Sequence, residues 1–148
     1  MNVMQSKFAQ QTDLHSWMEL VSLVEDNFPG LIIDEYKQYL IQRIKDKSAV
    51  TIKNDDIVIG ALTFSKENKE IEFLAVHPDY RKQGIAANMV KFMIAQFEKG
   101  TEIFVVTYRN DDLKGKSARR FYKKMGFSEG EYLTLFDYSC QKLLYTTK

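Results

Sequence analysis

The sequence contains little cysteine and little histidine. Cys140 is the only cysteine, and His15 and His77 are the only histidines among 148 residues. A disulfide framework and a thiolate cluster for zinc or iron-sulfur binding are therefore excluded, and a single free thiol suits a reducing compartment. The two histidines do not have the spacing of metal ligands. We predict a cytoplasmic protein with no bound metal.

Long apolar runs and a large net charge are also lacking. Residues 1–11 carry no apolar core of a secretory signal, and no stretch approaches the roughly 20 apolar residues of a membrane helix. The formal net charge is +1, so no global field attracts nucleic acid or an anionic membrane. We therefore expect neither a nucleic acid nor a membrane as partner.

The composition is that of an ordinary globular chain. Hydrophobic residues make up 45% and charged residues 28% of the sequence, which is enough for a hydrophobic core without disulfide or metal staples. Linkers, internal repeats and low-complexity tracts are not found. We predict a single domain that spans residues 1–148.

Two amphipathic helices are predicted near the N-terminus. Apolar residues recur at three- and four-residue steps from Asp13 to Phe28, and Pro29-Gly30 ends this helix. Asp34 is placed to cap a second helix. The predicted buried stripe of the second helix is Tyr36, Tyr39 or Leu40, and Ile44.

The periodicity then changes to two, which is typical of strands. Strands are predicted over 49–53, 57–64 and 70–76, and Asn54-Asp55-Asp56 forms the first turn. His77-Pro78 ends the third strand because proline lacks the N–H of a ladder. These segments predict an antiparallel meander.

The rest of the chain alternates between helix and strand. A helix is predicted from Ile85 to Phe97 with Gly100 as its stop, followed by a strand from Thr101 to Tyr108 that is apolar on both faces. A strand-helix-strand order makes this strand parallel to the one at 70–76. The resulting fold class is α+β, with a mixed, mostly antiparallel sheet flanked by helices.

The last third of the sequence is predicted to form a short helix and two strands. Ala118, Phe121, Tyr122 and Met125 share one helix face, which Gly126 closes. The strands are predicted over 131–138 and 141–145.

The segment from Ile71 to Ala86 joins a strand to a helix through a basic turn. The first N–H groups of a helix lack partners and carry the positive end of its dipole, and Gly84 allows an anion to approach the backbone. Arg81 and Lys82 add charged donors. These features are typical of a phosphate site, although Gly84 and its neighbours taken alone favour an ordinary strand-to-helix turn.

Two sequence blocks carry a family pattern. Arg81-Lys82-Gln83-Gly84-Ile85-Ala86 fits Arg/Gln-x-x-Gly-x-Gly/Ala, and Phe121-Tyr122 to Gly126-Phe127 fits Phe-Tyr-x-x-x-Gly-Phe. The chain resembles the GNAT superfamily of acyl-CoA-dependent N-acyltransferases over nearly its whole length. This resemblance implies a three-layer GNAT-like fold and acetyl-CoA as co-substrate, with transfer of the acetyl group directly to a primary amine.

The resemblance also implies which residues contact coenzyme A. The loop amides would hold the pyrophosphate, and the main chain of the 70–76 strand would hold the pantetheine arm, with the Leu74 amide polarising the thioester carbonyl. The implied cofactor-binding residues are Leu74, Ala75, Val76, Arg81, Lys82, Gln83, Gly84, Ile85, Ala86 and Ala87.

Three residues are candidates for proton transfer. An alkylammonium ion must lose a proton before it attacks a carbonyl, and Glu70 and Glu72, two apart on one strand, are predicted to share a face. Glu70 matches the position where family members often carry a base. By the same resemblance Tyr122 protonates the departing thiolate. Two solvated glutamates and a core tyrosine are the alternative interpretations.

The sequence departs from the family pattern at one position. Gly115 stands seven residues before Tyr122, where many relatives have a cofactor-contacting asparagine, and Asn110 is a candidate replacement. The acceptor amine, a small molecule or a peptide, is expected near 30–34 and 130–133. An exposed C-terminal strand would permit a homodimer by strand pairing.

Two other functions remain open. One is a coenzyme A-binding regulatory or interaction module without catalysis. The other is nucleic-acid binding through a cationic cluster, against which the net charge argues. The cluster consists of Lys114, Lys116, Arg119, Arg120, Lys123 and Lys124.

Overall fold

The computed structural model describes residues 4–135 and 137–148, which form one sheet and its covering helices. The helices are α1 (Leu14–Val24), α2 (Ile33–Lys45), α3 (Ile85–Ile94) and α4 (Lys116–Met125). The strands are β1 (Lys7–Phe8), β2 (Ala49–Asn54), β3 (Ile57–Ser65), β4 (Glu70–Val76), β5 (Glu102–Tyr108), β6 (Ser128–Leu135) and β7 (Tyr138–Thr146). Their order in the sheet is β1-β2-β3-β4-β5-β7-β6, and only the β4–β5 pair is parallel.

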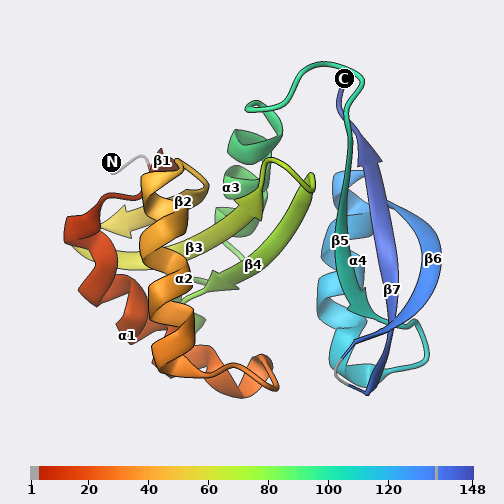
Figure 1. Cartoon of the computed structure of the whole chain (residues 1–148), viewed down its shortest axis with the longest axis horizontal. Coiled ribbons are helices and arrows are strands. Elements are labelled where there is room, and N and C mark those ends of the chain that lie inside the picture. Colours follow the sequence, from red (N-terminus) through yellow and green to blue (C-terminus); the bar gives the residue numbers. More distant parts are fainter. Residues whose placement is uncertain (1–3, 136) are drawn as a thin grey trace.

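Two hydrophobic cores lie on opposite faces of this sheet. One core joins α1 and α2 to β2, β3 and β4. The other joins α3 and α4 to strands from both halves of the sheet, from Val50 in β2 to Leu143 in β7. Figure 1 shows the resulting three layers. The mixed, mostly antiparallel sheet flanked by helices confirms the predicted fold class.

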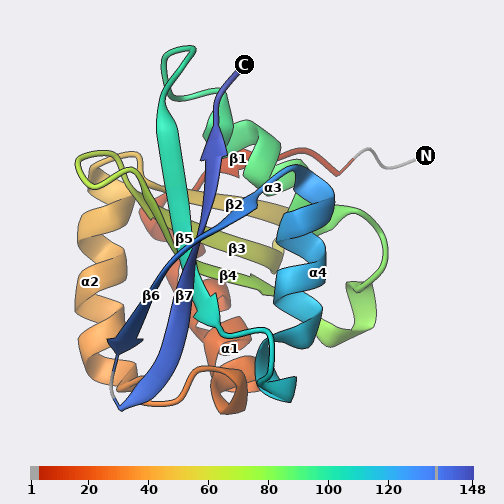
Figure 2. The same ribbon diagram turned by 90° about the vertical axis from the view of Figure 1, so that its right-hand side faces the viewer.

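The two halves of the sheet meet over a short distance. β4 pairs with β5 at two positions, Glu70 with Phe104 and Ile71 with Val105, whereas β5 pairs with β7 at seven. Beyond these two pairs β4 and β5 diverge, and β5 and β7 run across the direction of β2 to β4 (Figure 2). The predicted parallel β4–β5 arrangement is confirmed, but its pairing covers only the start of β4.

The N-terminal helices differ from the prediction at their ends. The helix predicted to reach Phe28 ends at Val24, and a 3-10 turn over Glu25–Asn27 follows. This tighter turn still directs Phe28 inward, where its ring stacks on Phe73 at 4.5 Å between centroids. The N-cap of α2 is Ile32 and not Asp34, which lies in the first turn, where a negative charge suits the helix dipole.

The α3–β5 connection corrects two further predictions. α3 ends at Ile94, and Phe97 N–H donates to Ile94 O in a tighter turn, so that Gly100, with a φ of 85°, leads into β5 rather than ending the helix. In β5 only Ile103, Val105 and Thr107 are buried. The prediction that both faces are covered was wrong because α1 and α2 cover β2 to β4 alone.

The buried face of α4 is shifted from its predicted position. Tyr122 is buried, but Ala118 is exposed and Arg119 is buried in its place. Gly126 ends the helix in the left-handed region, as predicted, with a φ of 104°.

The C-terminal hairpin begins earlier than predicted. The strand predicted over 131–138 spans the turn between β6 and β7, where Asp137 has a φ of 65°; Phe136 lies outside the described residues. The last strand, β7, lies between β5 and β6, so the sheet edges are β1 and β6. The expectation of an exposed C-terminal strand was therefore wrong. None of the helices among residues 4–135 and 137–148 is long and apolar enough to cross a membrane.

Candidate functional site

A bulge in β4 changes which main-chain groups face β5. Ile71 pairs with Phe64 and Phe73 pairs with Thr63, so Glu72 is an extra residue in β4. Beyond the bulge, His77 N–H donates to Ile59 O of β3. Since main-chain groups alternate along a strand, those of Val76 and Leu74 face the opening toward β5.

Ala75 differs from its two neighbours in this alternation. It pairs with Ala61 of β3, and its side chain is buried in the core beneath α1 and α2. Among the strand residues predicted to bind the cofactor, Leu74 and Val76 therefore present main-chain groups to the opening, and Ala75 does not.

The loop after β4 presents unpaired amides at the start of α3. The first main-chain bond of the helix joins Asn88 N–H to Gly84 O at 3.0 Å, so the amides of residues 85–87 precede the helical ladder. Lys82 and Gly84 both adopt positive φ, at 63° and 77°. Residues 81–84 are exposed. This turn therefore directs free N–H groups to solvent, as an anion site requires.

Side chains at the start of the loop fix its direction. His77 Nδ1 accepts a hydrogen bond from Asp79 N–H at 3.1 Å, which caps a 3-10 turn over Pro78–Tyr80. The Tyr80 hydroxyl accepts a hydrogen bond from Asn54 Nδ2 at 2.8 Å. His77, to which the sequence assigned no role, is thus part of the loop's anchor.

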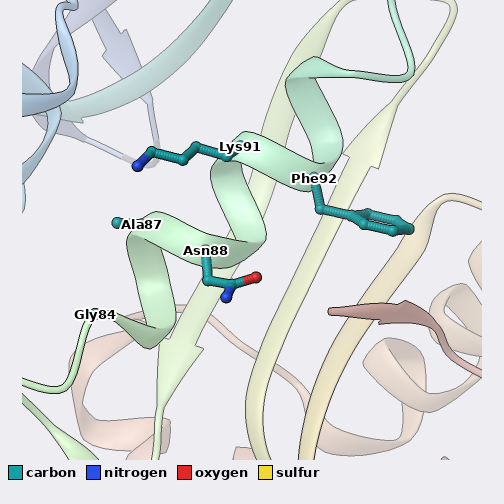
Figure 3. Close-up of a pocket in the computed structure, with 5 residues that line it drawn as sticks. All are labelled: Gly84, Ala87, Asn88, Lys91 and Phe92. Carbon is teal, nitrogen blue, oxygen red and sulfur yellow. The ribbon is translucent and has the colours of Figure 1, made fainter. Parts of the chain in front are cut away.

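Two open hollows lie near these elements. One, of about 530 Å³, begins at Gly84 and runs along the outer face of α3 past Ala87, Asn88, Lys91 and Phe92. Figure 3 shows that Lys91 and Phe92 point to opposite sides of that hollow. The other, of about 510 Å³, lies beside the β4–β5 pairs. It is lined by Asn68, Lys69, Glu102, Phe104, Glu131, Lys142 and Leu144.

Glu70 lies where the two halves of the sheet join. It is the first residue of β4, pairs with Phe104 and is half-buried. Burial raises the pKa of the Glu70 carboxyl, the negative charge of Glu72 raises it further, and the ammonium group of Lys142 lowers it in part. A carboxyl with a raised pKa at the mouth of an opening is suited to accept a proton.

Glu72 lies close enough to influence Glu70 but is already bonded. Its Oε1 accepts from the Tyr39 hydroxyl at 2.6 Å and from Arg43 Nε at 2.8 Å, and its Oε2 accepts from an Arg43 terminal nitrogen at 3.2 Å. Both carboxylate oxygens are therefore occupied by donors from α2.

Tyr122 reaches the core from α4. Its ring packs against Phe121 and Phe127, with centroid distances of 5.0 and 5.2 Å, and the residue is 4% exposed. Burial raises the pKa of its hydroxyl above the usual range, so the phenol keeps its proton at neutral pH. Tyr122 packs in the core that also contacts Leu74 and Val76.

The family asparagine would not fit at Gly115 in this fold. A Cβ added there would lie 2.7 Å from Tyr108 Cβ, closer than side-chain carbons approach. The 3-10 turn over Leu113–Gly115 therefore packs on Tyr108 through a residue without a side chain. Asn110 is exposed in the loop before it.

Arg119 was predicted to lie in an exposed cationic cluster, but it is buried. It is 4% exposed and donates to Tyr108 O at 3.1 Å, to Gln141 Oε1 at 2.9 Å and to Glu129 Oε1 at 2.9 Å. It thereby joins α4 to β5, β6 and β7 and does not belong to an exposed cationic cluster. Its spacing of three residues from Tyr122 was the available signal for burial.

The part of the chain that the structure describes contains no cluster of side chains suited to bind a metal ion. No group of three or more His, Cys, Asp or Glu side chains is placed there to hold an ion.

Comparisons with known proteins place these features in context. A family model for the acetyltransferase (GNAT) domain matches residues 45–129, more than half of the chain. No curated protein matches the sequence.

Several solved structures share the fold at low sequence identity. Ard1 from Thermoplasma volcanium has a TM-score of 0.78 and 14% identity over 99% of both chains. A GNAT-family acetyltransferase from Bacillus cereus has a TM-score of 0.76 and 19% identity over 99% of this chain and 98% of its own. Naa50 from Arabidopsis thaliana, in complex with the bisubstrate analogue CoA-Ac-MVNAL, has a TM-score of 0.72 and 19% identity over 97% of this chain and 98% of its own.

Proposed function

Because the chain belongs to the GNAT acetyltransferase family, we propose that it transfers an acetyl group from acetyl-coenzyme A directly to a primary amine. The observation that carries this proposal is the opening between β4 and β5, which pair at only two positions and then diverge toward the free amides at the start of α3. An extended thioester substrate fits such an opening as an added strand would.

The co-substrate would lie along main-chain groups. The amides of residues 82–87 would bind the pyrophosphate, with Arg81 beside them, and those of Leu74 and Val76 would bind the pantetheine arm. The Leu74 amide would donate to the thioester oxygen, where negative charge develops as the amine attacks. The new C–N bond forms as the C–S bond breaks, and coenzyme A leaves as a thiolate.

We assign the proton transfers to two side chains. Glu70 would accept the ammonium proton, directly or through water, because its raised pKa and its position where β4 meets β5 favour that role. Tyr122 would donate a proton to the departing thiolate, since burial keeps its hydroxyl protonated, and the second proton that the nitrogen loses as the amide forms would restore the phenol.

The acceptor would enter from the end of the molecule that carries the α1–α2 connection and the β6–β7 turn, which lie at the same end in both views (Figures 1 and 2). The Naa50 complex contains a peptide joined to coenzyme A. Peptide amino termini therefore belong beside small alkylamines and lysine among the acceptors to test.

The experiment is an acetyl-CoA consumption assay over such a panel of amines. It compares the wild type with Glu70→Gln and, as a matched control, Glu67→Gln, which changes an exposed glutamate in the β3–β4 turn. We expect at least one amine to stimulate thioester loss with the wild type and the control but not with Glu70→Gln.

Two results would contradict the proposal. If no amine stimulates thioester loss while acetyl-CoA still raises the melting temperature, the protein is a coenzyme A-binding module without catalysis. If acetyl-CoA neither reacts nor stabilises the fold, the opening does not bind this substrate.

A further inference from the structure

Three side chains connect the β4 bulge to α2. Two of them come from α2, and the third comes from β3, the strand that pairs with the bulge. The Tyr39 hydroxyl lies 2.6 Å from Glu72 Oε1 and 2.7 Å from Thr63 Oγ1. Arg43 binds both Glu72 oxygens, and its guanidinium carbon lies 5.0 Å from the centre of the Tyr39 ring. Tyr39 and Arg43 together join α2 to β3 through Thr63 and to β4 through Glu72.

The position of this network in the sheet gives it a specific effect. Thr63 is the last β3 residue before the register shifts, and Glu72 is the extra residue of β4. If the alternation of main-chain groups ran unbroken from Ile71 through Glu72, it would direct Leu74 and Val76 toward β3 and away from β5. The bulge thus decides whether the Leu74 amide faces the opening.

The contacts that hold Glu72 are sheltered and directional. The side chains of Arg43 and Glu72 are 24% and 22% exposed, although Glu72 as a whole residue is exposed. A guanidinium that binds both oxygens of a carboxylate fixes its orientation better than a single donor does. Burial raises the pKa of the Tyr39 hydroxyl, as does its bond to Glu72.

We propose that Arg43 and Tyr39 are positioning residues, which hold Glu72 and thereby keep the bulge in the register that presents the Leu74 amide. Glu72 is then a structural anchor and not the proton acceptor. This inference rests on the proposed function for its effect on catalysis, while its effect on the bulge is independent of activity.

The charges around Glu70 provide a test that separates the two glutamates. Glu72 faces Glu70 from the same strand, with Arg43 of α2 bound to it, and Lys142 faces Glu70 from β7, with Glu131 of β6 bound at 3.0 Å. Removing the Glu72 charge lowers the pKa of Glu70, because a neighbouring negative charge disfavours ionisation.

The experiment measures kcat and KM against pH for Glu72→Gln, Tyr39→Phe, Arg43→Met and Arg43→Lys. Glu19→Gln, which breaks an exposed contact with His15 on α1, is the matched control. We expect Glu72→Gln to keep the acid limb of its kcat–pH profile but to move that limb to lower pH. Tyr39→Phe and Arg43→Met should lower kcat about tenfold with little change in KM for acetyl-CoA, because a small misplacement of the amide is costly.

A second readout follows the bulge itself. In amide NMR spectra of the free protein, Tyr39→Phe and Arg43→Met should shift the resonances of Leu74 and Val76 and leave those of β6 unchanged. Arg43→Lys should fall between wild type and Arg43→Met, since lysine keeps the charge but not the paired donors.

Each result decides one claim. If Glu72→Gln loses the acid limb and is as inactive as Glu70→Gln, Glu72 is the base and the inference is wrong. Unchanged Leu74 and Val76 resonances in both α2 variants would also overturn it. A wild type that acetylates no amine contradicts the proposed function alone, because the NMR comparison still tests the bulge.

Discussion

The two halves of the sheet are built differently. β2, β3 and β4 are covered on both faces, by α1 and α2 on one side and by α3 on the other. β5 and β7 contribute to only one of the two cores and β6 to neither, and Phe104, Val106 and Tyr108 of β5 remain partly exposed on its other face. One half is therefore a closed sandwich and the other is an open sheet.

Strand pairing is interrupted at the border between the two halves. Within each half neighbouring strands pair along their length, β3 with β4 and β5 with β7. At the border with the open half, the pairing of β4 is limited to Glu70 and Ile71. Substitutions at this border and within each half of the sheet test the contrast.

Removing the carboxylate at the border should have the largest effect. Glu70→Gln should lower kcat by about 10²- to 10⁴-fold, the range for loss of a general base, and leave the Kd of coenzyme A unchanged. Steady-state kinetics and calorimetry measure the two quantities, and a kcat within twofold of wild type would exclude Glu70 as the base.

The same variant has a pH-dependent effect on stability. Since the folded state raises the pKa of Glu70, the unfolded chain binds fewer protons, and stability falls as pH rises through the raised pKa. Glu70→Gln removes that fall, so the variant should be more stable than wild type at neutral pH by less than about 1 kcal/mol, because the site is half exposed. Urea denaturation at pH 4 and pH 7 measures the difference.

The stability of the open half of the sheet depends on Arg119, which joins α4 to β5, β6 and β7. Arg119→Ala removes three hydrogen bonds and leaves the buried Gln141 without one partner, so the free energy of unfolding should fall by about 2 to 3 kcal/mol. Arg120→Ala, the exposed neighbour on α4, should change it by less than about 0.5 kcal/mol. Equal losses in the two variants would show that Arg119 does not join the open half together.

A substitution at Gly84 tests whether the loop between β4 and α3 binds coenzyme A. A Cβ at Gly84 meets no atom within 4 Å, but the φ of 77° is strained for alanine. Gly84→Ala should therefore raise the Kd of coenzyme A about tenfold and reduce stability by about 1 kcal/mol. Gly100→Ala, with a φ of 85° and equally open surroundings, should reduce stability alike without affecting the Kd.

The smallest expected effect concerns a charge supplied by the open half. Lys142 lowers the pKa of Glu70, so Lys142→Met should raise it and move the acid limb of the kcat profile to higher pH. Lys142→Arg keeps the charge and should leave the limb in place. A shift to lower pH in Lys142→Met would show that Glu70 does not control this limb.

Local signals in the sequence predicted most of the fold. The change of period at Ala49, the turn at Asp55-Asp56 and the glycine after α4 identified their elements because local chemistry fixes them. The strand boundary near Asp137 was missed because the residues around it are apolar enough to continue a strand.

The site was only partly predictable for a different reason. Gly84 and Tyr122 were proposed because they lie within the two family blocks, and Glu70 because it matches the position where family members often carry a base. Arg43 and Lys142 come from elements distant in sequence, and only the tertiary fold brings them to Glu72 and Glu70. A charged residue on an amphipathic helix gives no local sign that it faces another strand.

The most direct test of the opening is an amide NMR titration of the wild type with coenzyme A. We expect saturable shifts of the amide resonances of Leu74, Val76 and residues 84–87, with the β6 amide resonances unchanged. Saturable binding that leaves all of these β4 and loop amides unaffected, or no binding at all, would contradict this prediction.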